Sequence, residues 1–141
     1  MATYLIVANR TLPSQTLASA LAERAADRDA RFHVVVPATP IGAGLTWDEE
    51  ASRAAAQERL DAVLARLHDL GATEASGEVG VPDPVAAVED ALRHRSADEI
   101  VLSTLPPGIS RWLGQDVPTR LRSCVAVPVT VVTAATGSGG R

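Results

Sequence analysis

The chain has 141 residues, of which 46% are hydrophobic and 21% charged, which excludes a disordered protein and allows one domain with a full core. Seventeen acidic and 13 basic residues give a net charge of −4, which argues against a dedicated nucleic-acid binder because such proteins carry a basic excess. All 13 basic residues are arginine, so mechanisms that need a lysine, such as a Schiff base, are excluded.

The first part of the chain predicts two buried strands with a helix between them. A short apolar run at Tyr4–Ala8 is typical of a strand buried on both faces of a parallel sheet. Ser14 is placed to cap a helix that runs to about Asp29, with apolar residues at four-residue spacing, namely Leu17, Leu21 and Ala25. A second apolar run at Phe32–Val36 is stopped by Pro37 and predicts the next strand.

A long helix and a weak strand follow. Thr46 and Glu49 fit a capping box, and the helix they begin should run to about Leu70 and end at Gly71. Its core-facing residues are predicted to be Leu60, Val63, Leu64 and Leu67. The segment Glu74–Val79 predicts a short strand, which we expect at a sheet edge.

The N-terminus of the third helix is clearly marked in the sequence. Asp83 is a capping residue and Pro84 suits the first helical position, so we expect a helix from there to about Arg95. Its buried residues are predicted to be Val85, Val88, Ala91 and Leu92. The segment Glu99–Ser103, with three consecutive apolar residues, predicts the fourth strand.

The last part of the chain predicts a long loop, a short helix and a fifth strand. The loop Thr104–Gln115 runs up to Asp116, which is placed to cap a helix containing Val117 and Leu121. The segment Val127–Thr133 predicts the fifth strand. We therefore expect one domain over residues 1–135 and a flexible glycine-rich tail over 136–141.

The alternation of strands and helices predicts an α/β fold. Right-handed crossovers between successive strands would place a parallel sheet between two layers of helices. Ligands of such sheets bind beyond the carboxyl ends of the strands, where the strand order reverses. Three loops should meet there: Asn9–Pro13, Pro37–Leu45 and Thr104–Gln115, the last of which leads into a helix N-terminus that favours an anion.

Five segments, in this order, resemble the universal stress protein family. They are Tyr4–Ala8 with the polar residue after it, Phe32–Val35, Gly80–Pro84, Ala97–Leu102 and Val127–Val132. The resemblance covers roughly residues 3 to 134. It implies an adenine nucleotide alpha hydrolase-like, three-layer open sheet of five parallel strands in the order 3-2-1-4-5, a role in the stress response, and a homodimer.

The phosphate-binding motif of one branch of that family is altered. That branch binds ATP through spaced glycines after the fourth strand, where this chain has Ser103 and Pro106, and through a glycine–serine pair, where it has Gln115 and Asp116. Gly114 would meet the motif only after a one-residue shift. The family's acidic residue after the first strand is replaced by Asn9.

These changes disfavour that mode of ATP binding. Proline removes a main-chain donor, and the carboxylate of Asp116 would repel a phosphate by roughly 1 to 4 kcal/mol at intermediate dielectric. An adenine nucleotide bound in another way stays open, since Arg111 could hold a phosphate with Arg10 and Trp112 could stack on a base. The alternative is that Trp112 plugs the loop onto the core and Arg111 is solvated.

The candidate ligand contacts follow from the three loops and the resemblance. They are Asn9, Arg10, Thr11, Val35, Ser103, Thr104, Arg111, Trp112, Gly114 and Asp116. The expected ligand is ATP or another adenine nucleotide, with no metal required. No carboxylate pair or glycine-x-serine-x-glycine elbow is present, which disfavours catalysis.

Histidine and cysteine are expected to be structural. His33 should be a satisfied core or edge histidine, and His68 and His94 should lie on helix surfaces. The single cysteine, Cys124, excludes an internal disulfide and is predicted to be an inert, partly buried thiol. With no signal peptide visible and no apolar run near the roughly 20 residues of a membrane helix, we expect a cytoplasmic protein that binds no membrane.

The fifth strand predicts an assembly. Val127–Thr133 is rich in β-branched residues, carries no charge and would lie at a sheet edge, which is an aggregation hazard unless something pairs with it. We expect a homodimer through this strand. The leading hypothesis is a non-enzymatic binding or signalling domain, and the alternatives are a ligand-free interaction module and a nucleotide hydrolase.

Overall fold

Five parallel strands form one sheet in the order β3-β2-β1-β4-β5. The computed structural model describes residues 2–8, 15–27, 29–38, 49–104 and 117–133. The predicted fold class and strand order are confirmed. The strands are β1 (Thr3–Ala8), β2 (Arg31–Pro37), β3 (Glu74–Gly80), β4 (Glu99–Thr104) and β5 (Val129–Thr133).

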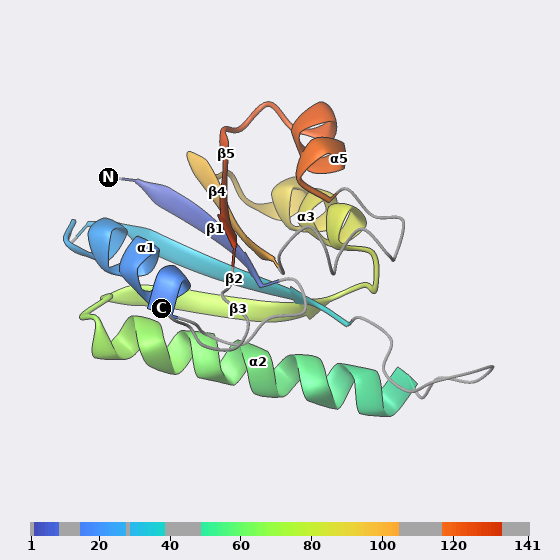
Figure 1. Cartoon of the computed structure of the whole chain (residues 1–141), viewed down its shortest axis with the longest axis horizontal. Helices are drawn as coiled ribbons and strands as arrows, with labels where there is room; N and C mark the ends of the chain where they lie inside the picture. Colours follow the sequence, from blue (N-terminus) through green and yellow to red (C-terminus); the bar gives the residue numbers. More distant parts are fainter. Residues whose placement is uncertain (1, 9–14, 28, 39–48, 105–116, 134–141) are drawn as a thin grey trace.

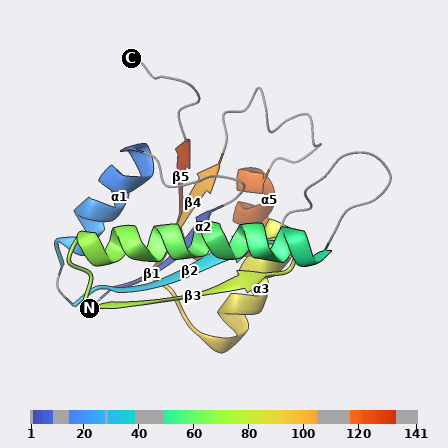
Figure 2. The same ribbon diagram turned by 90° about the horizontal axis from the view of Figure 1, so that it is seen from below.

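Helices cover both faces of the sheet and make a three-layer arrangement (Figure 1). They are α1 (Gln15–Ala25), α2 (Glu49–Asp69), α3 (Pro84–His94) and α5 (Val117–Cys124). On one face, α1 and α2 bury leucines against the sheet, and α2 runs across β2 and β3 (Figure 2). On the other face, α3 and α5 bury Val88 and Leu121 against β1, β2 and β4.

The central strands are buried on both faces because alternate side chains enter the two cores. Ile6 and Val34 pack towards α1 and α2, whereas Leu5, Val7 and Val35 pack towards α3 and α5. All five of these side chains are fully buried or nearly so. This explains why the strands appear in the sequence as continuous apolar runs rather than alternating ones.

Two predicted helix ends are confirmed in detail. The N–H of Gly71 donates to the carbonyl of His68, and the N–H of Ala72 donates to that of Leu67, so α2 ends in a Schellman motif. Gly71 has a φ of +92°, a conformation that glycine adopts without a Cβ penalty. At the start of α3, the Asp83 carboxylate accepts from the N–H of Ala86, and Pro84 occupies the first turn.

Some predicted boundaries were wrong. α1 ends at Ala25 rather than near Asp29, because a turn follows in which the Asp27 carboxylate accepts from the N–H of Asp29. β5 begins at Val129 rather than Val127, after Pro128, which has no N–H to donate to the ladder. The predicted caps Ser14, Thr46 and Asp116 and the tail at 136–141 lie outside the described residues.

The predicted edge strand is confirmed, since β3 forms one edge of the sheet and β5 forms the other. Close packing holds β3 against α2, and a Cβ added at Gly77 would lie 2.4 Å from Leu60 Cδ1. Within the described ranges, no helix is long and apolar enough to cross a bilayer.

Candidate functional site

The strand order reverses between β1 and β4. The chain leaves β1 for α1 and β2 on one side, and it returns to place β4 on the other side of β1. At the carboxyl end of this pair, Ala8 of β1 lies beside Ser103 of β4. This is the topological switch point at which open α/β sheets bind ligands, so it is the candidate site.

Three of the ten predicted contacts lie among the described residues. Ser103 is fully buried in β4, between Ala8 and Val132 of the neighbouring strands. Thr104 is the last residue of β4 and pairs with Thr133. Both lie at the carboxyl end of the sheet, as the sequence predicts.

Val35 is also fully buried, in the core beneath α3, so its side chain does not face solvent. Its contact with a ligand stays a prediction. The other predicted contacts lie outside the described residues; they are Asn9, Arg10, Thr11, Arg111, Trp112, Gly114 and Asp116.

An ion pair joins the two helices that begin at this end of the sheet. Nη2 of Arg120 in α5 lies 3.1 and 3.2 Å from the two carboxylate oxygens of Asp83, the cap of α3. Both side chains are half exposed, so the pair contributes little stability by itself. It links α5 to the cap of α3, and no local sequence pattern predicts it because the partners are 37 residues apart.

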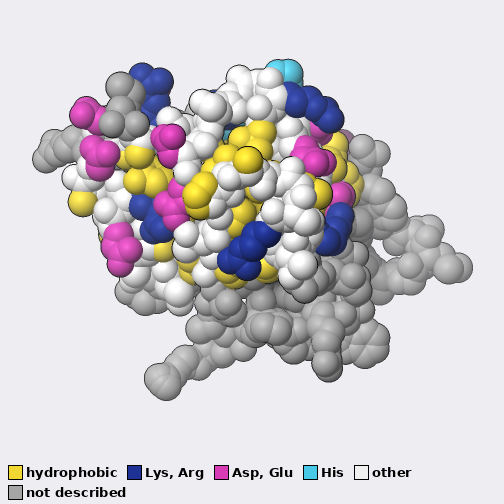
Figure 3. Space-filling model, turned by 90° about the horizontal axis from the view of Figure 1, so that it is seen from above, with side chains coloured by type: hydrophobic (Ala, Val, Ile, Leu, Met, Phe, Trp, Pro, Cys, Tyr) yellow, Lys and Arg dark blue, Asp and Glu magenta, His cyan; other side chains and the backbone are white. Residues whose placement is uncertain are grey.

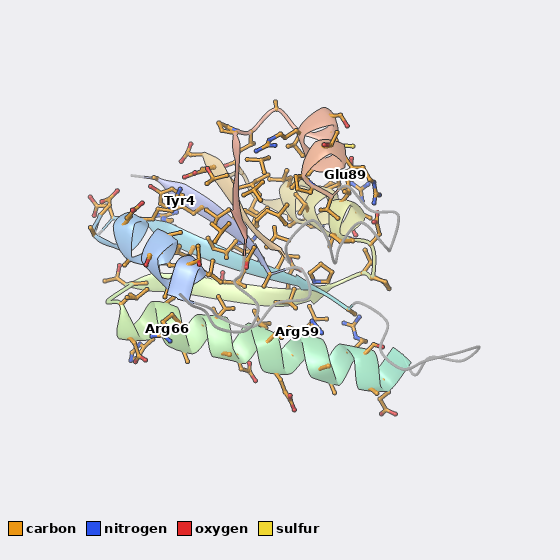
Figure 4. All side chains as sticks on the ribbon, viewed as in Figure 1. Tyr4, Arg59, Arg66 and Glu89 are labelled. Atoms are coloured by element: carbon orange, nitrogen blue, oxygen red, sulfur yellow. The ribbon has the colours of Figure 1, made fainter. Side chains whose placement is uncertain are left out.

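A second polar cluster lies at the opposite, amino end of the sheet. Arg24 of α1 donates through Nε and Nη2 to both carboxylate oxygens of Glu99, at 3.0 and 2.8 Å, and through Nη1 to the carbonyl of Ala20. Thr130 of β5 donates to the same carboxylate. The Arg24 guanidinium lies 5.8 Å from the ring centre of Tyr4, which Figure 4 labels on β1.

The hydrogen bonds from Arg24 lower the pKa of Glu99, while its partial burial acts in the opposite direction. The bond to Glu99 likewise raises the pKa of Arg24. Because Glu99 is the first residue of β4, this cluster is a full strand away from the switch point. It ties α1, β4 and β5 together and belongs to the framework, not to the site.

His33 is a satisfied histidine, as predicted. Its Nδ1 lies 2.9 Å from Ser76 Oγ, and its Nε2 lies 2.9 Å from Glu78 Oε2. His68 and His94 are exposed on helix surfaces, which is also as predicted. The expectation that Cys124 is partly buried was wrong, because it ends α5 and is exposed.

Comparison with known protein families found no match, and neither did comparison with curated proteins. Solved structures do match. A universal stress protein family member from Burkholderia pseudomallei is 24% identical, with 93% of this chain and 96% of that chain covered and a TM-score of 0.59.

Two further matches are structures with nucleotides. A universal stress protein in complex with cAMP is 20% identical, with 96% and 100% coverage and a TM-score of 0.62. The universal stress protein from Archaeoglobus fulgidus in complex with dAMP is 24% identical, with 94% and 100% coverage and a TM-score of 0.62. Since these matches cover 93 to 96% of the chain, this chain has the fold of the universal stress proteins.

Proposed function

We propose that this protein is a non-enzymatic, universal stress protein-like domain that binds an adenine nucleotide at the carboxyl ends of β1 and β4. The observation that carries the proposal is the switch point between these strands. Proteins with the same fold have been solved with cAMP and dAMP, which supports an adenine nucleotide as the ligand.

Charge and chain geometry support an anionic ligand at this place. Arg10 follows the last residue of β1 by two positions in the sequence. Arg111 belongs to the sequence between β4, which ends at the switch point, and α5. Two arginines near one strand edge could bind a phosphate through charge-assisted hydrogen bonds without a glycine-rich loop.

The replacement Arg111→Ala is expected to weaken nucleotide binding by about 10- to 100-fold, the usual cost of losing a hydrogen bond to a charged group. The measurement is calorimetric titration with ATP, cAMP and dAMP, preceded by mass spectrometry of any nucleotide that co-purifies. Arg93→Ala is the matched control, since it removes the same charge from an exposed residue of α3 that pairs with Asp90. Unchanged affinity in Arg111→Ala would remove this arginine from the site.

A ligand-free interaction module is the second candidate. It is favoured by the burial of Ser103, the polar residue of β4 beside Ala8, whose side chain is closed off from solvent. If no nucleotide co-purifies and none of the three binds at millimolar concentration, the first candidate is wrong and this one stands.

We also propose that the protein forms a homodimer through β5, by antiparallel pairing with its twin. β5 is an edge strand, and hydrophobic side chains gather on the face on which β5 and α5 lie (Figure 3). Four valines of this region are only partly buried: Val125, Val127, Val129 and Val131. Pairing two copies would cover both the apolar surface and the open edge.

The main chain of β5 shows where to break such a dimer. The Pro128 carbonyl accepts from the N–H of Ile100 in β4. Main-chain groups of alternate residues point to the same side of a strand, so those of Pro128, Thr130 and Val132 face β4. Those of Val131 therefore face the open edge. The replacement Val131→Pro would remove an outward donor without removing a hydrogen bond to β4.

In light scattering at tens of micromolar, the wild type is expected to have twice its chain mass of 14.7 kDa, and Val131→Pro to be a monomer. Ala75→Pro is the control, because Ala75 likewise faces outward on the opposite edge strand β3, where the Gly80 carbonyl faces β2. A monomeric wild type, or a dimer that Ala75→Pro breaks and Val131→Pro leaves intact, would contradict this interface.

A further inference from the structure

A serine, a histidine and a carboxylate form a continuous row on the α3 side of β2 and β3. His33 of β2 lies between Ser76 and Glu78 of β3, with 2.9 Å from Nδ1 to Ser76 Oγ and 2.9 Å from Nε2 to Glu78 Oε2. The His33 side chain is 6% exposed, whereas Ser76 and Glu78 are exposed. The row is far from the switch point, because β3 is the edge strand on the other side of β2.

The partners of His33 decide which ring nitrogen carries the proton. An ionised carboxylate can only accept, so in the neutral imidazole Nε2 holds the hydrogen that is donated to Glu78. Nδ1 is then an acceptor, and the hydroxyl of Ser76 is the group that donates to it. Glu78 thus holds His33 as a base directed at the Ser76 hydroxyl, which is the arrangement that activates serine nucleophiles.

The base is rigid and the nucleophile is accessible. Hydrogen bonds at both ring nitrogens and the burial of the side chain hold the His33 ring in place. α3 packs mainly over β2, so Ser76 is left exposed on the edge strand. A reagent can therefore approach Ser76 Oγ from solvent while His33 stays in place.

The edge strand also supplies main-chain donors. The Gly80 carbonyl faces β2, where it accepts from the N–H of Ala38, so the main chain of Gly77, three residues earlier, faces the open side. The N–H of Gly77 comes directly after Ser76 in the sequence. An N–H at that position could stabilise a developing oxyanion.

We propose that Ser76 is a nucleophilic serine that is acylated by small activated esters, with His33 as its general base and Glu78 as the positioning residue. Ser76 Oγ forms a bond to the carbonyl carbon of the ester and its proton passes to His33 Nδ1. The ester C–O bond breaks, and the leaving alcohol takes the proton from Nδ1.

The test is labelling of the whole protein with p-nitrophenyl acetate and with a fluorophosphonate, followed by peptide mass spectrometry. The adduct is expected on Ser76 and should disappear in Ser76→Ala. His33→Gln should slow the labelling by about 100-fold, the usual contribution of a general base. Glu78→Ala and Glu78→Gln should each slow it roughly tenfold or more, because an amide can donate to Nε2 and favour the wrong tautomer of His33.

Ser123 provides the matched control. It is an exposed serine whose hydroxyl donates to the carbonyl of Arg120 and which makes no described bond to a histidine. Ser123→Ala should leave the labelling unchanged. If His33→Gln fails to fold, the two Glu78 variants carry the test, since Glu78 is half exposed.

Three results would overturn the proposal. They are the absence of an adduct at Ser76, equal labelling of Ser76 and Ser123, and a rate at Ser76 that does not change in Glu78→Ala. If the three side chains only hold β3 against β2, Glu78→Ala should lower the melting temperature and leave the labelling rate of Ser76 unchanged. If they form a nucleophilic site, Glu78→Ala should lower the labelling rate itself.

Discussion

Glu99→Ala is expected to lower the free energy of unfolding by about 2 to 3 kcal/mol, somewhat less than the cost of breaking a fully buried ion pair. The Arg24 and Glu99 side chains are only 15% and 21% exposed, and Glu99 accepts from both Arg24 and Thr130. Its removal would leave the Arg24 guanidinium partly buried without its carboxylate. Urea denaturation at fixed protein concentration measures the loss.

Glu23→Ala is the control for this prediction. Glu23 lies 3.9 Å from the same guanidinium, but its side chain is 81% exposed, so the change should cost less than about 0.5 kcal/mol. Equal effects of the two alanine variants would show that burial and geometry do not determine the strength of the Arg24 pairs.

The pKa of Glu99 gives the same pair a pH dependence. Because hydrogen bonds from Arg24 lower the pKa of Glu99 in the folded state, its contribution is fully present above about pH 4.5, the ordinary value of a glutamate. The contribution is lost as the pH falls through the lower folded value. The wild type should therefore be more stable than Glu99→Gln at neutral pH, and this difference in unfolding free energy should shrink on acidification. A difference that stays constant from neutral to strongly acid pH would contradict this assignment.

Gly77→Ala is expected to destabilise the fold by about 1 to 3 kcal/mol, the range for overpacking a filled core. The new Cβ would lie 2.4 Å from Leu60 Cδ1 of α2 and 3.0 Å from the carbonyl oxygen of Val34. The leucine methyl can move, but the main chain of β2 is held in the sheet, so part of the strain remains. Thermal and urea denaturation measure the cost.

A double-mutant cycle with Leu60→Ala isolates this contact. Leu60→Ala alone should cost about 2 to 5 kcal/mol, because it opens a cavity between α2 and the sheet. In that background, adding the Cβ at residue 77 should cost less by about 1 kcal/mol. Strictly additive costs would show that the clash with Leu60 is relieved in another way.

Gly71→Ala should also destabilise the fold, but for a different reason than Gly77→Ala. No atom lies within 4 Å of a Cβ built at Gly71, but its φ of +92° is unfavourable for a side chain. The loss of stability in Gly71→Ala comes from backbone strain, so it should be the same in the wild type and in the Leu60→Ala background. The two glycines are thus required for separate reasons, close packing at one and chain reversal at the other.

Local patterns account for the success of the fold prediction. Continuous apolar runs marked the buried strands, and the capping residues Asp83 and Gly71 marked helix ends, because these features depend on neighbours within a few residues. The order of the strands came from the resemblance to universal stress proteins, and the parallel sheet in the order β3-β2-β1-β4-β5 confirms it.

Side-chain direction in the buried strands could not be predicted in the same way. Both faces of β2 and β4 are apolar, so the sequence of Val34 and Val35 gives no indication of which core each side chain enters. The burial of Val35 and Ser103 at the candidate site became visible only when helices were placed on both faces. The exposure of Cys124 likewise depends on where α5 ends.

The sequence by itself determined the alternation of elements and the helix ends marked by Asp83 and Gly71. It also predicted a candidate site at the loops after the strands, which stays a prediction. Only the tertiary structure decided the pairing of His33 with Ser76 and Glu78, of Arg24 with Glu99, and of Arg120 with Asp83. These partners are separated by 37 to 75 residues. Periodicity and capping describe contacts within one element, whereas pairs between elements depend on the register and packing of the whole sheet.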